Sequence, residues 1–163
     1  MSNADAKLDD RRRDFVFRAI HVMAGAGFAS LLPTTAARAT PDMLREAIDK
    51  LVGSAPVRAG RVKLDIPPLV ENGNTVPMTV SVESPMTEAD HVTEIHIFNE
   101  KNPQPYVLAA YFGPRAGKAA FATRAKLSDT QKIVAIARMN DGSFWSDSAD
   151  VIVTIAACVE INE

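Results

Sequence analysis

Hydrophobic and polar residues alternate along most of the chain after residue 60, and this period of two limits the fold more than any other feature. Such alternation buries one face of each strand. Turn-forming pairs such as Ser84-Pro85 and Asp141-Gly142 separate the alternating segments. Strands are therefore expected at residues 62–66, 75–83, 91–98, 106–112, 119–127, 131–139 and 151–156, with a short extra strand at 143–145. About seven short strands at this spacing predict an all-β, immunoglobulin-like antiparallel β-sandwich.

One helix is expected before the strands. Thr40 is a favourable N-cap residue, and Pro41 occupies the first helical position, where proline is preferred. Apolar residues then recur at helical spacing as far as Leu51, with charged residues between them, and Gly53 follows as a stop signal. This pattern predicts a single amphipathic helix packed on the edge of the strand domain.

The first 39 residues have the composition of an export signal. Arg11, Arg12 and Arg13 precede a weakly apolar stretch that ends in Ala37-Arg38-Ala39, the small-x-small pattern of a signal-peptidase site. Paired arginines in this position resemble the twin-arginine signal. We therefore expect residues 1–39 to be removed by cleavage after Ala39 and the protein to be periplasmic. An ordinary amphipathic helix is the alternative.

Charge and motif content exclude several function classes. The 163-residue chain has a net charge of −2, and the part after residue 39 keeps twelve Lys and Arg against sixteen Asp and Glu, so no basic surface indicates nucleic-acid binding. The apolar stretch near the amino terminus is too short and interrupted to span a bilayer. His91 and His96 share one expected strand but point to opposite faces, which argues against a shared metal. No cofactor motif and no acid/base pair is found, so an enzyme is not expected.

Cys158 is the single cysteine, and it lies just beyond the last expected strand. A thiol on such an arm could project from the sandwich by roughly 3.3–3.6 Å for each extended residue. With no second cysteine, no intrachain disulfide can form. Composition alone leaves two readings open: a nucleophile on a carboxyl-terminal arm at residues 156–163, or a half-buried cysteine that acts as a small hydrophobic residue.

Several runs of the sequence resemble the SoxY family, whose members are carrier subunits of the bacterial thiosulfate-oxidising (Sox) complex. They are Val62-Lys63-Leu64-Asp65-Ile66-Pro67, Glu71-Asn72-Gly73-Asn74-Thr75-Val76-Pro77, Val80-Ser81-Val82-Glu83-Ser84-Pro85-Met86-Thr87, His96-Ile97-Phe98-Asn99-Glu100-Lys101-Asn102-Pro103 and Asp141-Gly142-Ser143-Phe144-Trp145. The resemblance covers the whole chain after residue 39.

The resemblance implies a sandwich at residues 40–155 that pairs with a SoxZ-like subunit. It also implies an arm at residues 156–163 in which a cysteine, here Cys158, carries thiosulfate-derived sulfur covalently between the other Sox enzymes. The expected arm pattern is Gly-Gly-Cys-Gly-Gly. In this chain Ala156 and Ala157 stand in place of the first glycines, and Val159-Glu160-Ile161-Asn162-Glu163 replaces the last ones.

Two functions therefore remain. The first is a non-enzymatic covalent sulfur carrier without a bound cofactor. The second is a divergent SoxY-like paralogue that keeps the sandwich and binds partners as a structural subunit but carries no sulfur. Glu160 and Glu163 put negative charge near the thiol, which disfavours the thiolate and repels anionic sulfur species. An exposed, reactive Cys158 on a mobile arm would distinguish the first function from the second.

Overall fold

The computed structural model describes residues 40–157, which lie in one compact unit of the chain. Their elements, in chain order, are α2 (Pro41–Val52), β1 (Val57–Ala59), β2 (Val62–Asp65), β3 (Leu69–Asn72), β4 (Val76–Val82), β5 (Val92–Asn99), β6 (Tyr106–Tyr111), the 3-10 turn η1 (Pro114–Ala116), β7 (Ala119–Ala125), β8 (Gln131–Met139) and β9 (Phe144–Ile155). The expected signal segment, residues 1–39, lies outside the described residues.

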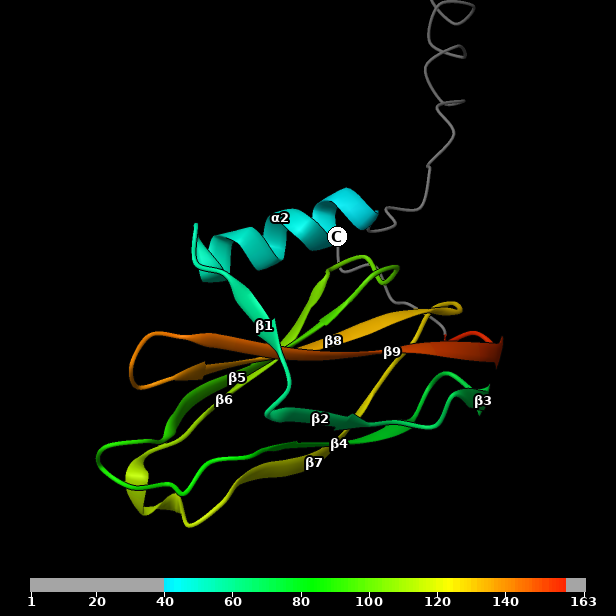
Figure 1. Ribbon diagram of the computed structural model, residues 1–163. Coiled ribbons are helices and arrows are strands. Elements are labelled where there is room, and N and C mark those ends of the chain that lie inside the picture. Colours follow the sequence, from blue (N-terminus) through cyan, green and yellow to red (C-terminus); the bar gives the residue numbers. More distant parts are fainter. Residues whose placement is uncertain (1–39, 158–163) are drawn as a thin grey trace, which may run out of the picture. The chain divides into compact units, whose positions relative to one another are not determined.

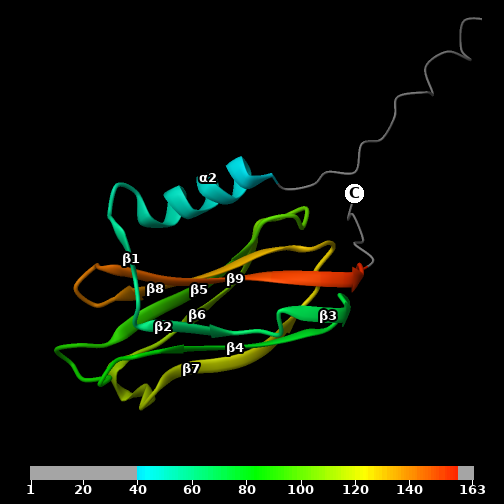
Figure 2. The ribbon, with the colours of Figure 1, turned by 45° about the vertical axis from the view of Figure 1, so that its right-hand side comes forward.

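The strands form two layers (Figures 1 and 2). The larger sheet has the order β1-β9-β8-β5-β6, with β3 also paired to β9, and the smaller sheet has the order β2-β4-β7. All pairs within the smaller sheet, and the pairs β9-β8, β8-β5 and β5-β6, are antiparallel. The predicted immunoglobulin-like sandwich is confirmed, and so is the hairpin between β8 and β9 around Asp141-Gly142.

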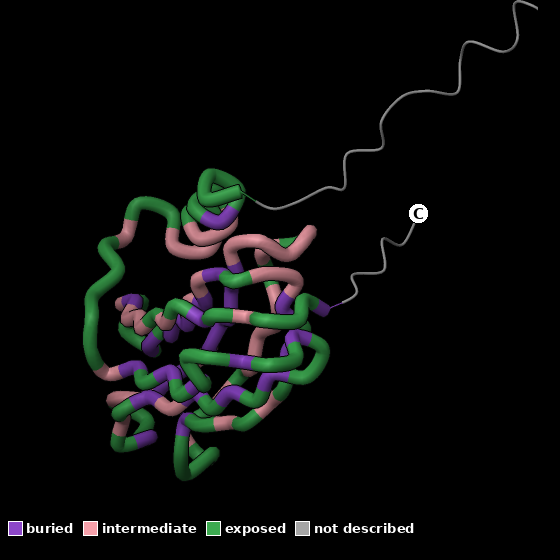
Figure 3. Tube along the Cα trace, turned by 90° about the vertical axis from the view of Figure 1, so that its right-hand side faces the viewer, coloured by how far each residue is buried: buried purple, intermediate pink, exposed green. Residues whose placement is uncertain are grey.

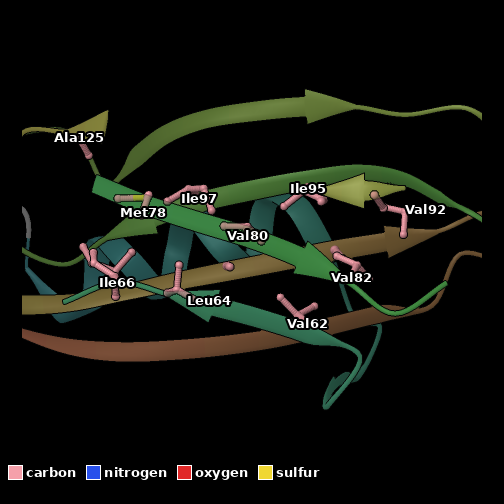
Figure 4. Packing of buried hydrophobic residues seen from close by; sticks show 14 of the residues in the cluster. Val62, Leu64, Ile66, Met78, Val80, Val82, Val92, Ile95, Ile97 and Ala125 are labelled. Atoms are coloured by element: carbon pink, nitrogen blue, oxygen red, sulfur yellow. The ribbon is translucent and has the colours of Figure 1, made fainter. Parts of the chain in front are cut away.

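The alternation of the sequence becomes the core between the two sheets. Val62, Leu64, Val80 and Val82 of the smaller sheet face Ile95 of the larger one (Figure 4). Along β4 the burial alternates from residue to residue, as the sequence predicts for a strand with one solvent face. Figure 3 shows the same pattern as a succession of buried and exposed positions along the strands. Burial of these aliphatic side chains supplies the main stabilisation of the sandwich.

The helix α2 is confirmed, but it covers a face of the larger sheet rather than an edge of the domain (Figure 2). Thr40 caps it, because the Thr40 hydroxyl accepts a hydrogen bond from the Met43 amide at 3.4 Å. Leu44 packs into a second apolar cluster with Phe98 and Phe144 on the outer face of that sheet. The strands beneath α2 are therefore buried on both faces. No helix among residues 40–157 is long and apolar enough to cross a membrane.

The last strand differs from the sequence-based expectation. The segments expected at 143–145 and 151–156 are two ends of one strand, β9. Its polar middle, residues 146–150, pairs continuously with β8. Asp147 also bridges the layers, since its carboxylate accepts a hydrogen bond from the Leu64 amide at 2.8 Å. Strand pairing and this cross-layer bond hold a segment whose composition alone favours a loop.

Two strands, β1 and β3, were not expected, and both run parallel to β9. β1 has three exposed residues and therefore no alternation to detect. β3 follows Pro67-Pro68 and has one buried residue, Val70. Both segments extend the larger sheet along the same edge of β9, β1 at its beginning and β3 at its end (Figure 1).

Candidate functional site at the end of β9

Cys158, the sulfur-attachment residue that the sequence indicates, lies outside the described residues, as do residues 159–163. The structure does place Ala157, the residue to which Cys158 is joined. Ala157 is buried, with 6% of its surface exposed. Its amide donates a hydrogen bond to the Leu127 carbonyl at 2.9 Å. The last described residue before the cysteine is thus part of the folded domain.

This finding alters the expected arm. The sequence suggested that the chain leaves the sandwich at about Ile155, so that an arm of about 10 Å would separate the strand from Cys158. β9 does end at Ile155. However, the hydrogen bond and the burial of Ala157 attach the chain for two residues more. Ala156 is exposed, and Ala157 turns back against the loop between β7 and β8.

Three chain segments meet at this point: the β3–β4 turn at Gly73, the β7–β8 loop at Leu127, and the end of the described chain at residues 155–157. The Gly73 amide donates to the Ile155 carbonyl at 2.8 Å. The Leu127 amide donates to the Gly73 carbonyl, also at 2.8 Å. With the bond from Ala157 to Leu127, these contacts form a closed set, which we call the backbone clasp.

A polar network fixes the β7–β8 loop that forms one side of the clasp. The Asn102 side chain joins this loop to the β5–β6 loop: its amide donates to the Lys126 carbonyl at 2.7 Å, and its oxygen accepts from the Ser128 amide at 3.0 Å. Gln131, which is 3% exposed, donates to the same oxygen at 2.9 Å. A further bond runs from the Val153 amide to the Thr130 hydroxyl at 3.0 Å. The loop is thereby held on both sides.

Exposed apolar side chains lie beside the clasp. Leu69 is 58% exposed, Ile152 is 55% exposed and Ile155 is 64% exposed. Leu69 and Ile152 are register partners on the neighbouring strands β3 and β9, so their side chains lie on the same face of the sheet. Ile155 is three residues further along β9, so its side chain points to the opposite face. Neighbouring large apolar side chains that stay exposed, as Leu69 and Ile152 do, are typical of surfaces that bind other molecules.

The two histidines within residues 40–157 lie in separate hydrogen-bonded environments. His91 precedes β5, and its Nδ1 lies 2.9 Å from the Thr87 carbonyl oxygen. His96 is buried and uses both ring nitrogens, with Nε2 2.8 Å from the Glu94 carboxylate and Nδ1 3.2 Å from the Tyr106 hydroxyl. Within residues 40–157, no group of three His, Cys, Asp or Glu side chains could hold a metal ion.

Comparison with known proteins places the chain in a family. The model of the sulfur oxidation protein SoxY family matches residues 48–158 and so includes Cys158. The chain belongs to the SoxY family. Among solved structures, it is similar to the sulfur carrier protein SoxY from Chlorobium limicola f thiosulfatophilum, with 29% identity and a TM-score of 0.59 over 70% of this chain and 98% of that one.

Other similarities concern the fold alone. A superoxide reductase (neelaredoxin) from Ignicoccus hospitalis matches with 21% identity and a TM-score of 0.52, over 71% of this chain and 94% of that one. At such identity the match shows a shared sandwich architecture rather than a shared activity. No curated protein matches the chain. The match to the SoxY family ends at Cys158 and does not include residues 159–163.

Gly73 and Leu127 were not recognised from sequence as part of the site. Gly73 lies in Asn72-Gly73-Asn74, which indicates a turn and nothing more. Leu127 has the pattern of a buried strand residue. Only the fold brings these two backbones against Ala157, because the three positions are separated by at least 30 residues along the chain.

Proposed function

We propose that this SoxY family member is a covalent carrier of thiosulfate-derived sulfur intermediates in sulfur oxidation, with Cys158 as the attachment site. The observation that carries the proposal is the family match, which extends through Cys158. The likeness to the sulfur carrier protein from Chlorobium limicola f thiosulfatophilum supports it. In this role the protein is a shuttled substrate for other Sox enzymes and not itself an enzyme.

The chemistry of loading requires a second protein. The Cys158 thiol first loses its proton to solvent. The resulting thiolate and the terminal sulfur of thiosulfate then form one S–S bond, and this coupling releases two electrons. An oxidoreductase of the Sox system must accept the electrons. The carrier needs only a thiol that another active site can reach, together with the absence of a neighbouring thiol that would displace the cargo. The second condition is met by the sequence, since Cys158 is the only cysteine.

The proposal includes a partner and a compartment. A SoxZ-like subunit forms a heterodimer with this chain, and exposed apolar strand residues such as Leu69 and Ile152 are candidates for the contact. Export follows the twin-arginine route into the periplasm, with cleavage after Ala39. Because α2 begins at Pro41 and is capped by Thr40, that cleavage removes no residue of the helix or its cap.

The test is intact-mass analysis of the protein isolated from thiosulfate-grown cells, together with thiosulfate turnover by the reconstituted Sox proteins. We expect a sulfur adduct that maps to Cys158 and disappears on mild thiol reduction. The Cys158→Ser variant should show no adduct and no turnover, while it unfolds at the same urea concentration as the wild type. Serine is nearly isosteric with cysteine, so a loss of turnover would reflect the missing thiol.

Two results would refute the carrier function. One is thiosulfate turnover by Cys158→Ser at a rate near that of the wild type. The other is a wild-type protein that never bears a sulfur adduct although its Cys158 reacts normally with iodoacetamide. Either result would favour the alternative function, a paralogue that binds Sox partners without carrying sulfur.

A further inference from the structure

The backbone clasp lies directly before the proposed carrier cysteine, and it is closed by hydrogen bonds between segments that are remote in sequence. Gly73 forms hydrogen bonds with both of the other segments of the clasp. Its amide binds the Ile155 carbonyl, and its carbonyl binds the Leu127 amide, each at 2.8 Å. The Leu127 carbonyl in turn accepts from the Ala157 amide at 2.9 Å. The last fixed peptide group before Cys158 is therefore held by the body of the sandwich.

Close approach explains the glycine at position 73. A Cβ atom there would lie 2.3 Å from the Leu127 carbonyl oxygen and 2.9 Å from the Ala157 amide nitrogen. The first distance is far shorter than any normal contact, and the obstructing atom is backbone, so a side chain would separate the segments. Gly73 is not among the glycines with positive φ. It is therefore the packing of the clasp, and not the turn conformation, that requires glycine here.

We propose that the clasp is a positioning device that sets the reach of Cys158, an inference that rests on the proposed carrier function. While the clasp is closed, Ala157 is fixed, and one peptide unit of about 3.8 Å between α-carbons is all that joins Cys158 to it. When the clasp opens, residues 156 and 157 are released. The cysteine is then three residues from the end of β9 and can extend by about 10 Å.

The two states suit two steps of a carrier. The closed state fixes Ala157, the residue before Cys158, against Leu127, so that a docked enzyme meets the thiol close to the sandwich. The open state lets the thiol enter a deeper active site. Since a single backbone hydrogen bond has a modest net strength, removing the one made by Ala157 should shift the opening equilibrium by about two- to tenfold.

Two variants open the clasp by different means, and one variant serves as control. Gly73→Ala places a methyl group against the Leu127 carbonyl. Ala157→Pro removes the amide that donates to Leu127 and leaves Gly73 and its two hydrogen bonds in place, so it tests the proposal even if Gly73→Ala folds poorly. Gly113→Ala is the matched control, because Gly113 has an extended φ of −126° and a Cβ there would meet nothing within 4 Å.

The measurement uses the full chain without sulfur cargo. In the wild type, the Ala157 amide should exchange its hydrogen much more slowly than an amide in an unstructured peptide. In Gly73→Ala this protection should fall. The rate of Cys158 reaction with a polyethylene-glycol maleimide, divided by the rate with iodoacetamide, should rise about two- to tenfold in Gly73→Ala and Ala157→Pro. A larger reagent gains more when the thiol moves away from the surface. Gly113→Ala should match the wild type.

The proposal is overturned if the wild-type Ala157 amide exchanges as fast as in a free peptide, or if the rate ratio is unchanged in both clasp variants. These readouts need no thiosulfate and no partner enzyme. A protein that shows the protection and the rate changes but never carries sulfur would refute the proposed function and leave the clasp intact. Loss of the clasp readouts in a protein that does carry sulfur would refute the clasp alone.

Discussion

Asn102 is the residue whose replacement tests most directly how the β7–β8 loop, which binds Ala157, is held. Its side chain makes four hydrogen bonds between the β5–β6 loop and the segment that leads into β8. The amide donates to the Lys126 carbonyl. The oxygen accepts from the Ser128 amide and hydroxyl and from the Gln131 side chain. Asn102→Ala removes all four bonds in one step while leaving the backbone of both loops unchanged.

The stability lost in Asn102→Ala depends on which of the former hydrogen-bonding partners of Asn102 stay buried. The Gln131 side chain is 3% exposed, and without Asn102 its amide keeps a 3.2 Å bond to the Asp129 carbonyl but loses the 2.9 Å bond. A buried donor left unpaired costs about 1–3 kcal/mol. Lys126 and Ser128 are close to solvent, so water replaces most of what their groups lose. We therefore expect Asn102→Ala to lower the free energy of unfolding by about 2 kcal/mol.

Equilibrium urea unfolding followed by the fluorescence of Trp145 measures this change. With a urea slope of about 1–3 kcal/mol per molar, the midpoint should fall by roughly 0.7–2 M. Asn74→Ala is the matched control, since the Asn74 amide binds Asn72 within an exposed turn, and its effect should stay within about 0.5 kcal/mol. An Asn102→Ala variant as stable as this control would show that the network contributes nothing to holding the loop.

Two further predictions concern the outer face of the larger sheet. Leu44→Ala should lower the free energy of unfolding by about 2–3 kcal/mol in a urea titration, because Leu44 of α2 is buried against Phe98 of the larger sheet. Met43→Ala, at an exposed neighbouring position, is the control and should change the free energy of unfolding by less than about 0.5 kcal/mol. Partial burial raises the pKa of Tyr106, so the folded state binds the phenolic proton more tightly than the unfolded state does. The stability that this provides is complete below the unfolded pKa of about 10 and is lost as pH rises through the folded pKa. The urea midpoint of the wild type should therefore fall more steeply above about pH 10 than that of Tyr106→Phe. Equal slopes for the two proteins would contradict a raised pKa of Tyr106.

Local sequence patterns were sufficient for the strands whose pairing is local. The segment 131–139 alternates, and Asp141-Gly142 closes a hairpin with the strand that follows, so both could be read from neighbouring residues. β1 and β3 could not be predicted in this way. Each pairs with β9, which lies more than 70 residues further along the chain, and neither carries the buried alternation that marks a strand.

The candidate site also has one part that local sequence patterns reveal and one part that depends on contacts between remote segments. Cys158 could be recognised from sequence, because it is the single cysteine and stands after the last apolar strand. The clasp could not, because a glycine between two asparagines indicates a turn whether or not another backbone lies against it. The contact that defines its role, a Cβ position 2.3 Å from the Leu127 carbonyl, exists only after the strands have been assembled.

The alanine at position 157 is better explained by the clasp than by a freely moving arm. Glycine is the residue that the SoxY pattern leads one to expect there, and it would leave the chain with the greatest backbone freedom. Alanine favours the anchored state in two ways. Its buried methyl group contributes up to about 0.8 kcal/mol of apolar burial, and it narrows the conformations of the released chain by about 0.4–1 kcal/mol. Together these contributions are comparable to the net strength of a typical backbone hydrogen bond. The alanine and the hydrogen bond from Ala157 to Leu127 both favour the anchored state. On the proposed carrier function, alanine at position 157 shortens the reach of Cys158, and any Sox enzyme that draws the thiol into a deep site must supply the free energy to open the clasp.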